Sequence, residues 1–301
     1  MQIIQKQKLL DLRNDVVFKL FFSRPKNKSI LISFLETVLN PSSPIEEVTI
    51  LNPTLPKNLV EDKGSVLDLV IQLKDFSKID VEMQVKDTEE YRERILYYWA
   101  KLHQNQLQTG DLYQKLTPTV SISVLAYNEF SDCNDEVHSI FELRERSRGT
   151  LYLPDMQLHF LELSKYHAWK EKHKKRHRLL DYWIRFFRAN DFQEVDFQEF
   201  RKESIMGKAL EALEELSQEP SARELAEMRE KARVNWLIIT SGAEAKGRAE
   251  GRVEGKVEGR VEGRVEGRVE GEKELIRKAA KSGMSAENIA ALFEMSIEEV
   301  K

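Results

Sequence analysis

Polar side chains interrupt two neighbouring segments that otherwise have the composition of β-strands. Residues 66–73 are almost continuously apolar, and Asp68 is the one charge among them. Residues 79–84 alternate strictly, so Asp80, Glu82 and Gln84 share one face of a strand. A buried carboxylate is costly unless a cation or a hydrogen-bond donor meets it. If Asp68 and Glu82 converge, a divalent cation is the natural partner, and Mg²⁺ fits because it retains several waters and takes one or two carboxylates.

This spacing resembles the metal-binding motif of the PD-(D/E)XK nucleases, in which an Asp on one strand precedes an acidic-x-Lys triplet on the next. The surrounding residues are more narrowly similar to the recombination-promoting nuclease/putative transposase family. The segments that carry this similarity are Asn14 to Lys19 (NDVVFK), Leu67-Asp68, Val81 to Gln84 (VEMQ), Tyr91 to Arg94 (YRER), Tyr97 to Trp99 and Gln106 to Pro118.

The resemblance implies a restriction-endonuclease-like α/β core and a metal-dependent DNA endonuclease linked to recombination or transposition. It implies Asp68 and Glu82 as ligands of Mg²⁺, with Mn²⁺ as the alternative, and a backbone carbonyl of Met83 or Val85 as a further oxygen. It also places Asp15 and Lys19 near the active site. The same two residues fit a plainer interpretation, in which they are solvated charges on a segment whose aromatics pack on the core.

Gln84 departs from the superfamily pattern, which has lysine at this position. Glutamine can orient a water molecule, but it carries no charge to stabilise an oxyanion. We expect a cation from elsewhere, with Lys63 as the first candidate and Arg94 as the second. Because loss of one such donor costs about 3 kcal/mol in comparable sites, Gln84 by itself predicts a slow enzyme.

Composition limits the remaining possibilities. The 301 residues, 41% of them hydrophobic, suffice for one sizeable core and an accessory region. The net charge of −4 means that any DNA-binding surface must be local. Cys133 is the single cysteine, which excludes an intramolecular disulfide. We find neither a secretory pattern nor an apolar run near the ~20 residues that span a membrane, and expect a cytoplasmic protein without a membrane partner.

The order of the predicted elements favours an α/β domain with a mixed sheet flanked by helices. The pattern predicts helices over residues 29–39 and from Asp87 towards Gly110. It predicts strands at 48–51, 66–73, 79–84 and 119–126, with further strands at 138–144 and 157–163 towards a sheet edge. Helices are expected at 179–187 and 207–216, and a longer helix is expected from Ala222.

Two groups of basic residues are candidates for DNA contact. Residues 164–179 interleave lysine and arginine with aromatics, which suits binding to a DNA backbone, although such a run is also typical of a solvated face. Arg92 and Arg94 open the helix after the hairpin and either pair with nearby glutamates or face a phosphate. The residues assigned to this role are Asp15, Lys19, Arg92, Arg94, Lys174, Lys175 and Arg176.

A four-residue repeat fills residues 247–271, with Gly, then Arg or Lys, then Val (Ala in the first unit), then Glu. A period of four is close to the helical 3.6, but each glycine costs about 1 kcal/mol relative to alanine. Every pair of residues four positions apart also joins two residues of the same kind, so like charges lie next to each other on the helix and repel. The segment is therefore either a flexible charged linker or a weakly stable helix that self-association supports. We favour the helix, in an arm spanning 241–271 that mediates homo-oligomerisation.

These patterns divide the chain into four parts. They are a nuclease-like core (1–163), a basic helical accessory region (164–240), the repeat arm (241–271) and a small C-terminal helical hairpin (272–301). The favoured function is a Mg²⁺-dependent DNA endonuclease. The alternatives are a catalytically weak DNA-binding protein and an oligomeric interaction protein, each of which retains the nuclease fold.

Overall fold

The computed structural model describes residues 8–52, 69–86, 88, 90–132, 135–173, 178–190 and 197–300, with backbone alone at residue 197 and residues 243–245. Within this part, the chain forms two compact units, residues 1–233 and 234–301. The four-part division predicted from the sequence stays a prediction. No helix in the described part is long and apolar enough to cross a membrane.

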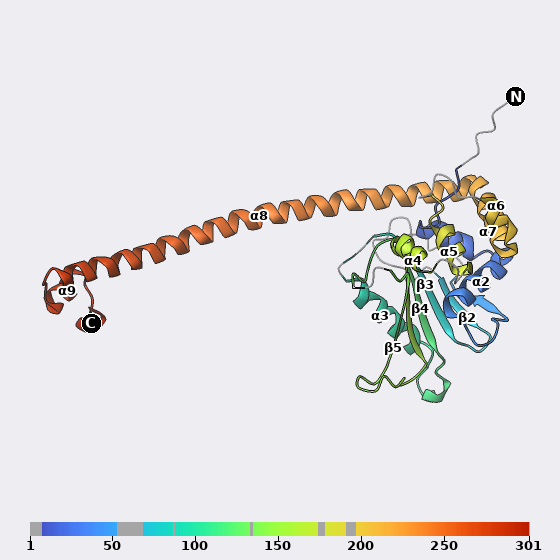
Figure 1. Ribbon diagram of the computed structural model, residues 1–301, viewed down its shortest axis with the longest axis horizontal. Helices are drawn as coiled ribbons and strands as arrows, with labels where there is room; N and C mark the ends of the chain where they lie inside the picture. Colours follow the sequence, from blue (N-terminus) through green and yellow to red (C-terminus); the bar gives the residue numbers. More distant parts are fainter. Residues whose placement is uncertain are drawn as a thin grey trace, which may run out of the picture. The chain divides into compact units, whose positions relative to one another are not determined.

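A six-stranded mixed sheet is the centre of the first unit (Figure 1). Its strands are β1 (Val48–Ile50), β2 (Leu69–Leu73), β3 (Lys78–Gln84), β4 (Thr119–Leu125), β5 (His138–Glu142) and β6 (Met156–Glu162). The order across the sheet is β1-β2-β3-β4-β6-β5. The pairs β3–β4 and β4–β6 are parallel, and the other three pairs are antiparallel. The predicted mixed sheet and its strands are thereby confirmed, and β5 lies at the edge as expected.

Helices cover both faces of this sheet. They are α1 (Asp15–Phe22), α2 (Lys28–Leu39), α3 (Tyr91–Gln104), α4 (Tyr166–Lys172), α5 (Arg178–Phe187), α6 (Phe197–Lys202) and α7 (Ser204–Gln218), with short 3₁₀ turns η1 (Pro25–Asn27), η2 (Tyr113–Lys115) and η3 (Leu163–Lys165). The α3 helix is shorter than expected: it ends at Gln104, and Gly110 lies beyond it in a turn with φ of 93°. This difference follows from the 105–112 segment, where Asp111 accepts a hydrogen bond from the Gln108 amide.

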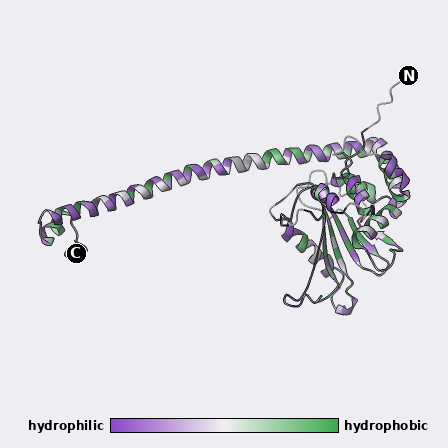
Figure 2. Ribbon diagram, in the orientation of Figure 1, coloured by the Kyte–Doolittle hydropathy of each residue, from purple (hydrophilic) through white to green (hydrophobic). Residues whose placement is uncertain are grey.

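The main core lies on the face that carries Ile79, Val81 and Met83. Phenylalanines of α1 and α2 pack there against α5, with ring centroids of Phe22 and Phe34 5.7 Å apart and those of Phe34 and Trp183 5.3 Å apart. Aromatic pairs of this kind add to the stability gained from burial alone. Figure 2 shows these hydrophobic segments in green beside the sheet. A smaller cluster on the opposite face joins Tyr91 and Ile95 of α3 to the sheet.

The last long helix is α8 (Pro220–Lys281), which is followed by α9 (Ala286–Leu292) and α10 (Ile297–Val300). Its first turns belong to the first unit. Asn14 donates to the Ala226 carbonyl at 3.1 Å, and Asp15 forms an ion pair with Arg229 at 2.6 Å. The repeat is helical throughout, so the helix and not the flexible linker is confirmed. Gly283, with φ of 87°, separates α8 from the small helices, and the Ser285 side chain caps α9 by accepting from the Asn288 amide.

Candidate active site

Two carboxylates point away from the main core on the central strand β3. Asp80 and Glu82 are 1% and 3% exposed, while Val81 between them packs in the main core. This alternation is the one that the sequence predicts. Burial of both carboxylates inside a sheet is the least expected feature of the strand, because ionised carboxyl groups are almost never fully buried without a compensating partner.

The strands on either side complete a polar strip at the same level. In the parallel register, Ser121 of β4 lies opposite Asp80, and Ser123 lies opposite Glu82. Both serines are fully buried. On the other side, Val70 of β2 is the partner of Asp80, and Leu69 is the partner of Val81. Because paired residues point to the same face, the serine side chains flank the two carboxylates.

Helix α3 covers this strip and brings a tyrosine and an arginine to it. Tyr91 is 1% exposed, and the guanidinium carbon of Arg94 lies 5.1 Å from the centroid of its ring. Nε and Nη2 of Arg94 are buried and have no hydrogen-bond acceptor among the described residues. A guanidinium with two buried and unused N–H donors is suited to a bidentate anion such as a phosphate.

Glu82 is the most perturbed carboxyl group at this site. Its Oε1 atom receives no hydrogen bond from any described residue. Burial raises its pKa from 4.5 to about 7, and the Arg94 charge opposes part of that rise. The Tyr91 hydroxyl is affected in the same direction, since burial and then the nearby Glu82 carboxyl raise its pKa. The site therefore contains a carboxylate whose charge the surrounding protein only partly stabilises.

Gln84 follows Glu82 on the same face, at the end of the strand. Its Nε2 donates to the Lys86 carbonyl at 3.0 Å. This bond fixes the orientation of the amide, so that the Oε1 atom is the end suited to accept a hydrogen bond. The structure thus gives Gln84 a defined pose without giving it a charge.

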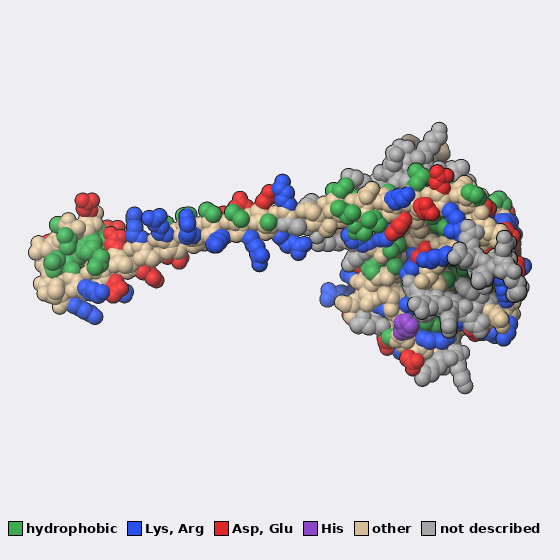
Figure 3. All heavy atoms as spheres, turned by 90° about the horizontal axis from the view of Figure 1, so that it is seen from above, with side chains coloured by type: hydrophobic (Ala, Val, Ile, Leu, Met, Phe, Trp, Pro, Cys, Tyr) green, Lys and Arg blue, Asp and Glu red, His purple; other side chains and the backbone are tan. Residues whose placement is uncertain are grey.

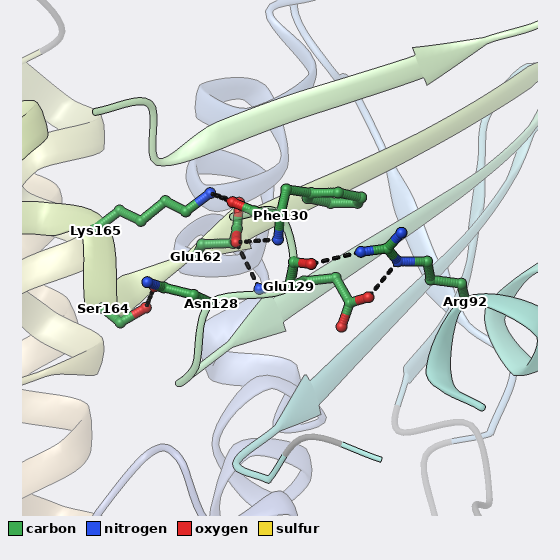
Figure 4. Close-up of polar contacts among 7 residues, drawn as sticks. All are labelled: Arg92, Asn128, Glu129, Phe130, Glu162, Ser164 and Lys165. Carbon is green, nitrogen blue, oxygen red and sulfur yellow. Dashed lines mark hydrogen bonds and ion pairs between the residues drawn. The ribbon is translucent and has the colours of Figure 1, made fainter. Parts of the chain in front are cut away.

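A third buried carboxylate organises the loop that follows β4 (Figure 4). Glu162 of β6 accepts hydrogen bonds from the backbone amides of Glu129 (2.7 Å) and Phe130 (3.0 Å). Its other oxygen pairs with Lys165 at 2.7 Å, and neither side chain is more than 1% exposed. Lys165 also donates to the Phe130 carbonyl, and Glu129 in turn binds Arg92 at the start of α3. This chain of contacts fixes the first turn of α3, and therefore positions Tyr91 and Arg94 over β3.

Comparison with known proteins agrees with this architecture. Residues 12–242 match the family described as PD-(D/E)XK nuclease family transposase, a match that covers most of the chain. The chain belongs to this family. No curated protein and no solved structure matches it significantly. The mixed six-stranded sheet with flanking helices is consistent with the PD-(D/E)XK nuclease fold, and the family connects the chain to nucleases and to transposition.

The structure brings together some of the site residues that the sequence predicts for this PD-(D/E)XK protein and places others elsewhere. Glu82, Gln84 and Arg94 come together at β3 and α3. Arg92 is bound to Glu129. Asp15 is bound to Arg229, and Lys19 is 2% exposed in α1, which packs in the main core on the opposite face from α3. Lys63, Asp68, Lys174, Lys175 and Arg176 lie outside the described residues.

The basic run around α4 is only partly described, and its described lysines have acidic partners. Lys170 pairs with Asp181 at 2.6 Å, and Lys172 pairs with Glu136 at 2.6 Å. Lys165 is buried with Glu162, as described above. Within the described ranges, no group of three or more His, Cys, Asp or Glu side chains could hold a metal ion. The predicted second ligand, Asp68, lies outside those ranges, so the predicted pair of Asp68 and Glu82 stays a prediction.

Sequence reasoning did not assign roles to several residues of this site. Asp80 carries a detectable signal, since it precedes Glu82 by one strand period. Ser121 and Ser123 are recognisable in the same way, because they are the polar positions of an otherwise apolar strand. The Glu162–Lys165 pair has no signal of its own, since its spacing across a strand end is shared by many solvated pairs.

Proposed function

We propose that this chain is a metal-dependent DNA endonuclease that hydrolyses phosphodiester bonds in recombination or transposition. The observation that carries this proposal is the buried Glu82 carboxylate, whose Oε1 has no donor in the described structure and whose pKa is raised to about 7. Perturbed carboxyl groups of this kind concentrate at functional sites. The site lies in a chain of the PD-(D/E)XK nuclease family transposases.

The residues present fit a hard divalent cation. Carboxylate oxygens are the ligands that Mg²⁺ prefers, and Mn²⁺ accepts the same set. We assign Asp68 as the second ligand. The support for this assignment is its place in the chain: Asp68 directly precedes Leu69, whose partner in the ladder is Val81, the neighbour of Glu82. A cation at Glu82 would also relieve the desolvation that raises the pKa of its carboxyl group.

A bound divalent ion would supply Lewis-acid polarisation of the phosphoryl oxygen and a water of lowered pKa. The chain's own residues perform the remaining tasks. Arg94 places two buried N–H donors beside the carboxylate, where they bind the oxygens of the scissile phosphate. Gln84, held by the Lys86 carbonyl, presents Oε1 to orient the attacking water. We assign the additional positive charge to Lys63, which the sequence places shortly before Asp68.

DNA cleavage tests the proposal directly. Purified protein is incubated with supercoiled and linear DNA, with Mg²⁺, with Mn²⁺ or with EDTA. We expect metal-dependent nicking or cleavage that Asp68→Asn and Glu82→Gln each abolish. Glu93→Gln is the matched control, because Glu93 is an exposed acid on α3, the helix that covers the site. Cleavage that survives both site substitutions contradicts the proposal.

A different outcome would favour a catalytically weak DNA-binding protein. The observation behind this alternative is that Gln84 provides no cation where most of the superfamily has lysine. DNA binding with steep salt dependence, no cleavage with either metal and no effect of Asp68→Asn would identify that function.

A further inference from the structure

We propose that residues 251–271, the repeat segment, bind the same segment of a second copy of this chain in parallel orientation. The segment contains five four-residue units and a closing Gly271, all within helix α8. The proposal rests on the side chains of this segment and is independent of the nuclease site.

The repeat segment has no electrostatic support within its own helix. Side chains three or four residues apart are neighbours on a helix surface. Inside residues 251–271, the residue four places after a Glu is again Glu, and the residue three places after it is Val. Inside the same residues, the residue four places after each basic residue is again basic, and the residue three places after it is Gly. No ion pair forms among the described residues 251–271, whereas Lys246–Glu250 (3.8 Å) and Glu274–Lys278 (2.9 Å) pair on either side of them.

The apolar side chains of the segment are also left in solvent. They are exposed by between 43% and 65%, and they comprise Val253, Val257, Val261, Val265 and Val269. Figure 3 shows hydrophobic, basic and acidic side chains together at the surface of the helix that carries the repeat. Glycine in every unit further disfavours an isolated helix relative to alanine. A helix of this composition needs a partner that covers valine and pairs both signs of charge.

The order of the residues around the helix selects that partner. Each residue turns the helix by about 100°, so Arg lies about 100° to one side of Val and Glu about 100° to the other. Gly lies behind, about 160° from Val. When two copies lie in parallel with their valines facing, the Arg side of each copy is next to the Glu side of the other, on both flanks. An antiparallel pair instead places Arg beside Arg and Glu beside Glu.

The period of four also sets the form of the contact. Successive valines advance by about 40°, so their stripe winds slowly around the helix as the i±4n ridge does. Two such ridges interlock at a crossing angle near −50°, a common class of helix packing. The contact then spans about three units before the helices diverge. Because the units are nearly identical, sliding one helix along the other by four residues preserves the contacts. The short contact predicts a modest, concentration-dependent association.

Sedimentation equilibrium of the full chain tests the association. We expect a reversible dimer that weakens with added salt. The triple variant Val257→Ala, Val261→Ala, Val265→Ala raises the dissociation constant by about tenfold or more. Since alanine is the better helix former, circular dichroism of this variant should show no loss of helix. Leu275→Ala, which removes an exposed apolar side chain outside the segment, is the matched control. A wild-type chain that stays monomeric at all concentrations overturns the proposal.

Charge exchange tests the pairing across the contact. An acidic variant (Arg260→Glu, Arg264→Glu) and a basic variant (Glu258→Lys, Glu262→Lys) should each associate more weakly than wild type. A mixture of the two should associate at least as well as wild type, because each flank again joins opposite charges. A mixture as weak as its components overturns the charge argument.

Orientation is measured with spin labels at residues 251 and 271, in a chain whose one native cysteine is replaced by Cys133→Ser. Parallel packing predicts that two copies labelled at 251 give a shorter distance than a mixture of copies labelled at 251 and at 271. A shorter mixed distance identifies antiparallel packing and overturns the proposal.

Discussion

Replacement of Glu82 by glutamine should stabilise the metal-free protein at alkaline pH. The carboxyl group is 3% exposed, and burial raises its pKa from 4.5 to about 7. A raised pKa means that the folded state holds the proton more tightly than the unfolded state does. The associated stability is complete below pH 4.5 and is lost as the pH rises through about 7. Glutamine has nearly the same shape and never ionises, so it avoids this loss.

The expected magnitude follows from the pKa difference. About 2.5 pKa units at about 1.36 kcal/mol each amount to roughly 3 kcal/mol of the free energy of unfolding at pH 8. At pH 5 the same calculation leaves less than about 1 kcal/mol, because the buried carboxyl group is then protonated. These values are upper bounds, since the glutamine amide introduces buried donors of its own. Glu82→Gln should therefore exceed wild type in stability by about 2 kcal/mol more at pH 8 than at pH 5.

Urea unfolding in EDTA at the two pH values measures this difference. Tryptophan fluorescence reports mainly the first unit, because three of the four tryptophans, Trp99, Trp169 and Trp183, lie in it, and Trp236 lies in the second unit. Mutant and wild type are compared at each pH, so the titration of every other group cancels. Glu93→Gln, an exposed substitution, should show the same stability change at both pH values.

Two results would refute the reasoning. If Glu82→Gln changes stability equally at pH 5 and pH 8, the carboxyl group does not titrate differently in the folded protein. If the substitution destabilises more at pH 8, the carboxylate has a strong native partner in the metal-free state. In that case it would not need a cation, and the argument for a metal ligand at this position would fail.

Three further predictions follow from other contacts. Burial, and then the charge of His138, lower the pKa of His159 to about 3. The stability that comes from the neutral imidazole is therefore complete above pH 6.5 and is lost as the pH falls. At pH 5, His159→Gln should avoid this loss of about 2 kcal/mol in the free energy of unfolding, as measured with urea. Lys165→Met should lower the free energy of unfolding by about 3 kcal/mol in the same assay, because it leaves the buried Glu162 carboxylate without its cation. Glu162→Gln combined with it should recover part of that loss. Arg94→Ala should weaken DNA binding more than Arg94→Lys does in fluorescence anisotropy, since only the guanidinium offers two donors to one phosphate. Equal losses for both Arg94 substitutions would contradict the assignment of those donors.

Local patterns were sufficient to predict most of the sheet. The alternation of β3 predicted which side of the strand Glu82 occupies, because a one-residue shift would have buried every polar side chain in the main core. The β-branched and apolar residues of 119–126 likewise predicted the strand that the structure has as β4. Such predictions succeed because side-chain period and burial depend on neighbours in the sequence.

Contacts between distant parts of the chain were not predictable in this way. The insertion of β6 between β4 and β5 is a property of topology, which chain order does not reveal. The ion pair between the Asp15 carboxylate and Arg229, 214 positions away, leaves no trace in the local pattern. The role of Glu162 likewise depends on a loop more than thirty residues earlier in the chain.

The energetics of Glu82 link stability to function. The raised pKa predicts that the Glu82 carboxylate destabilises the metal-free fold by roughly 3 kcal/mol at neutral to alkaline pH, a cost that glutamine would avoid in the same space. A ligand that binds only the folded state adds stability of RT ln(1 + [L]/Kd), which is about 2.7 kcal/mol at one hundred times Kd. A divalent cation at that occupancy would offset nearly the whole cost. Mg²⁺ should accordingly stabilise wild type at pH 8 and leave Glu82→Gln almost unchanged, and the difference between the two in urea unfolding would measure the site without any DNA present.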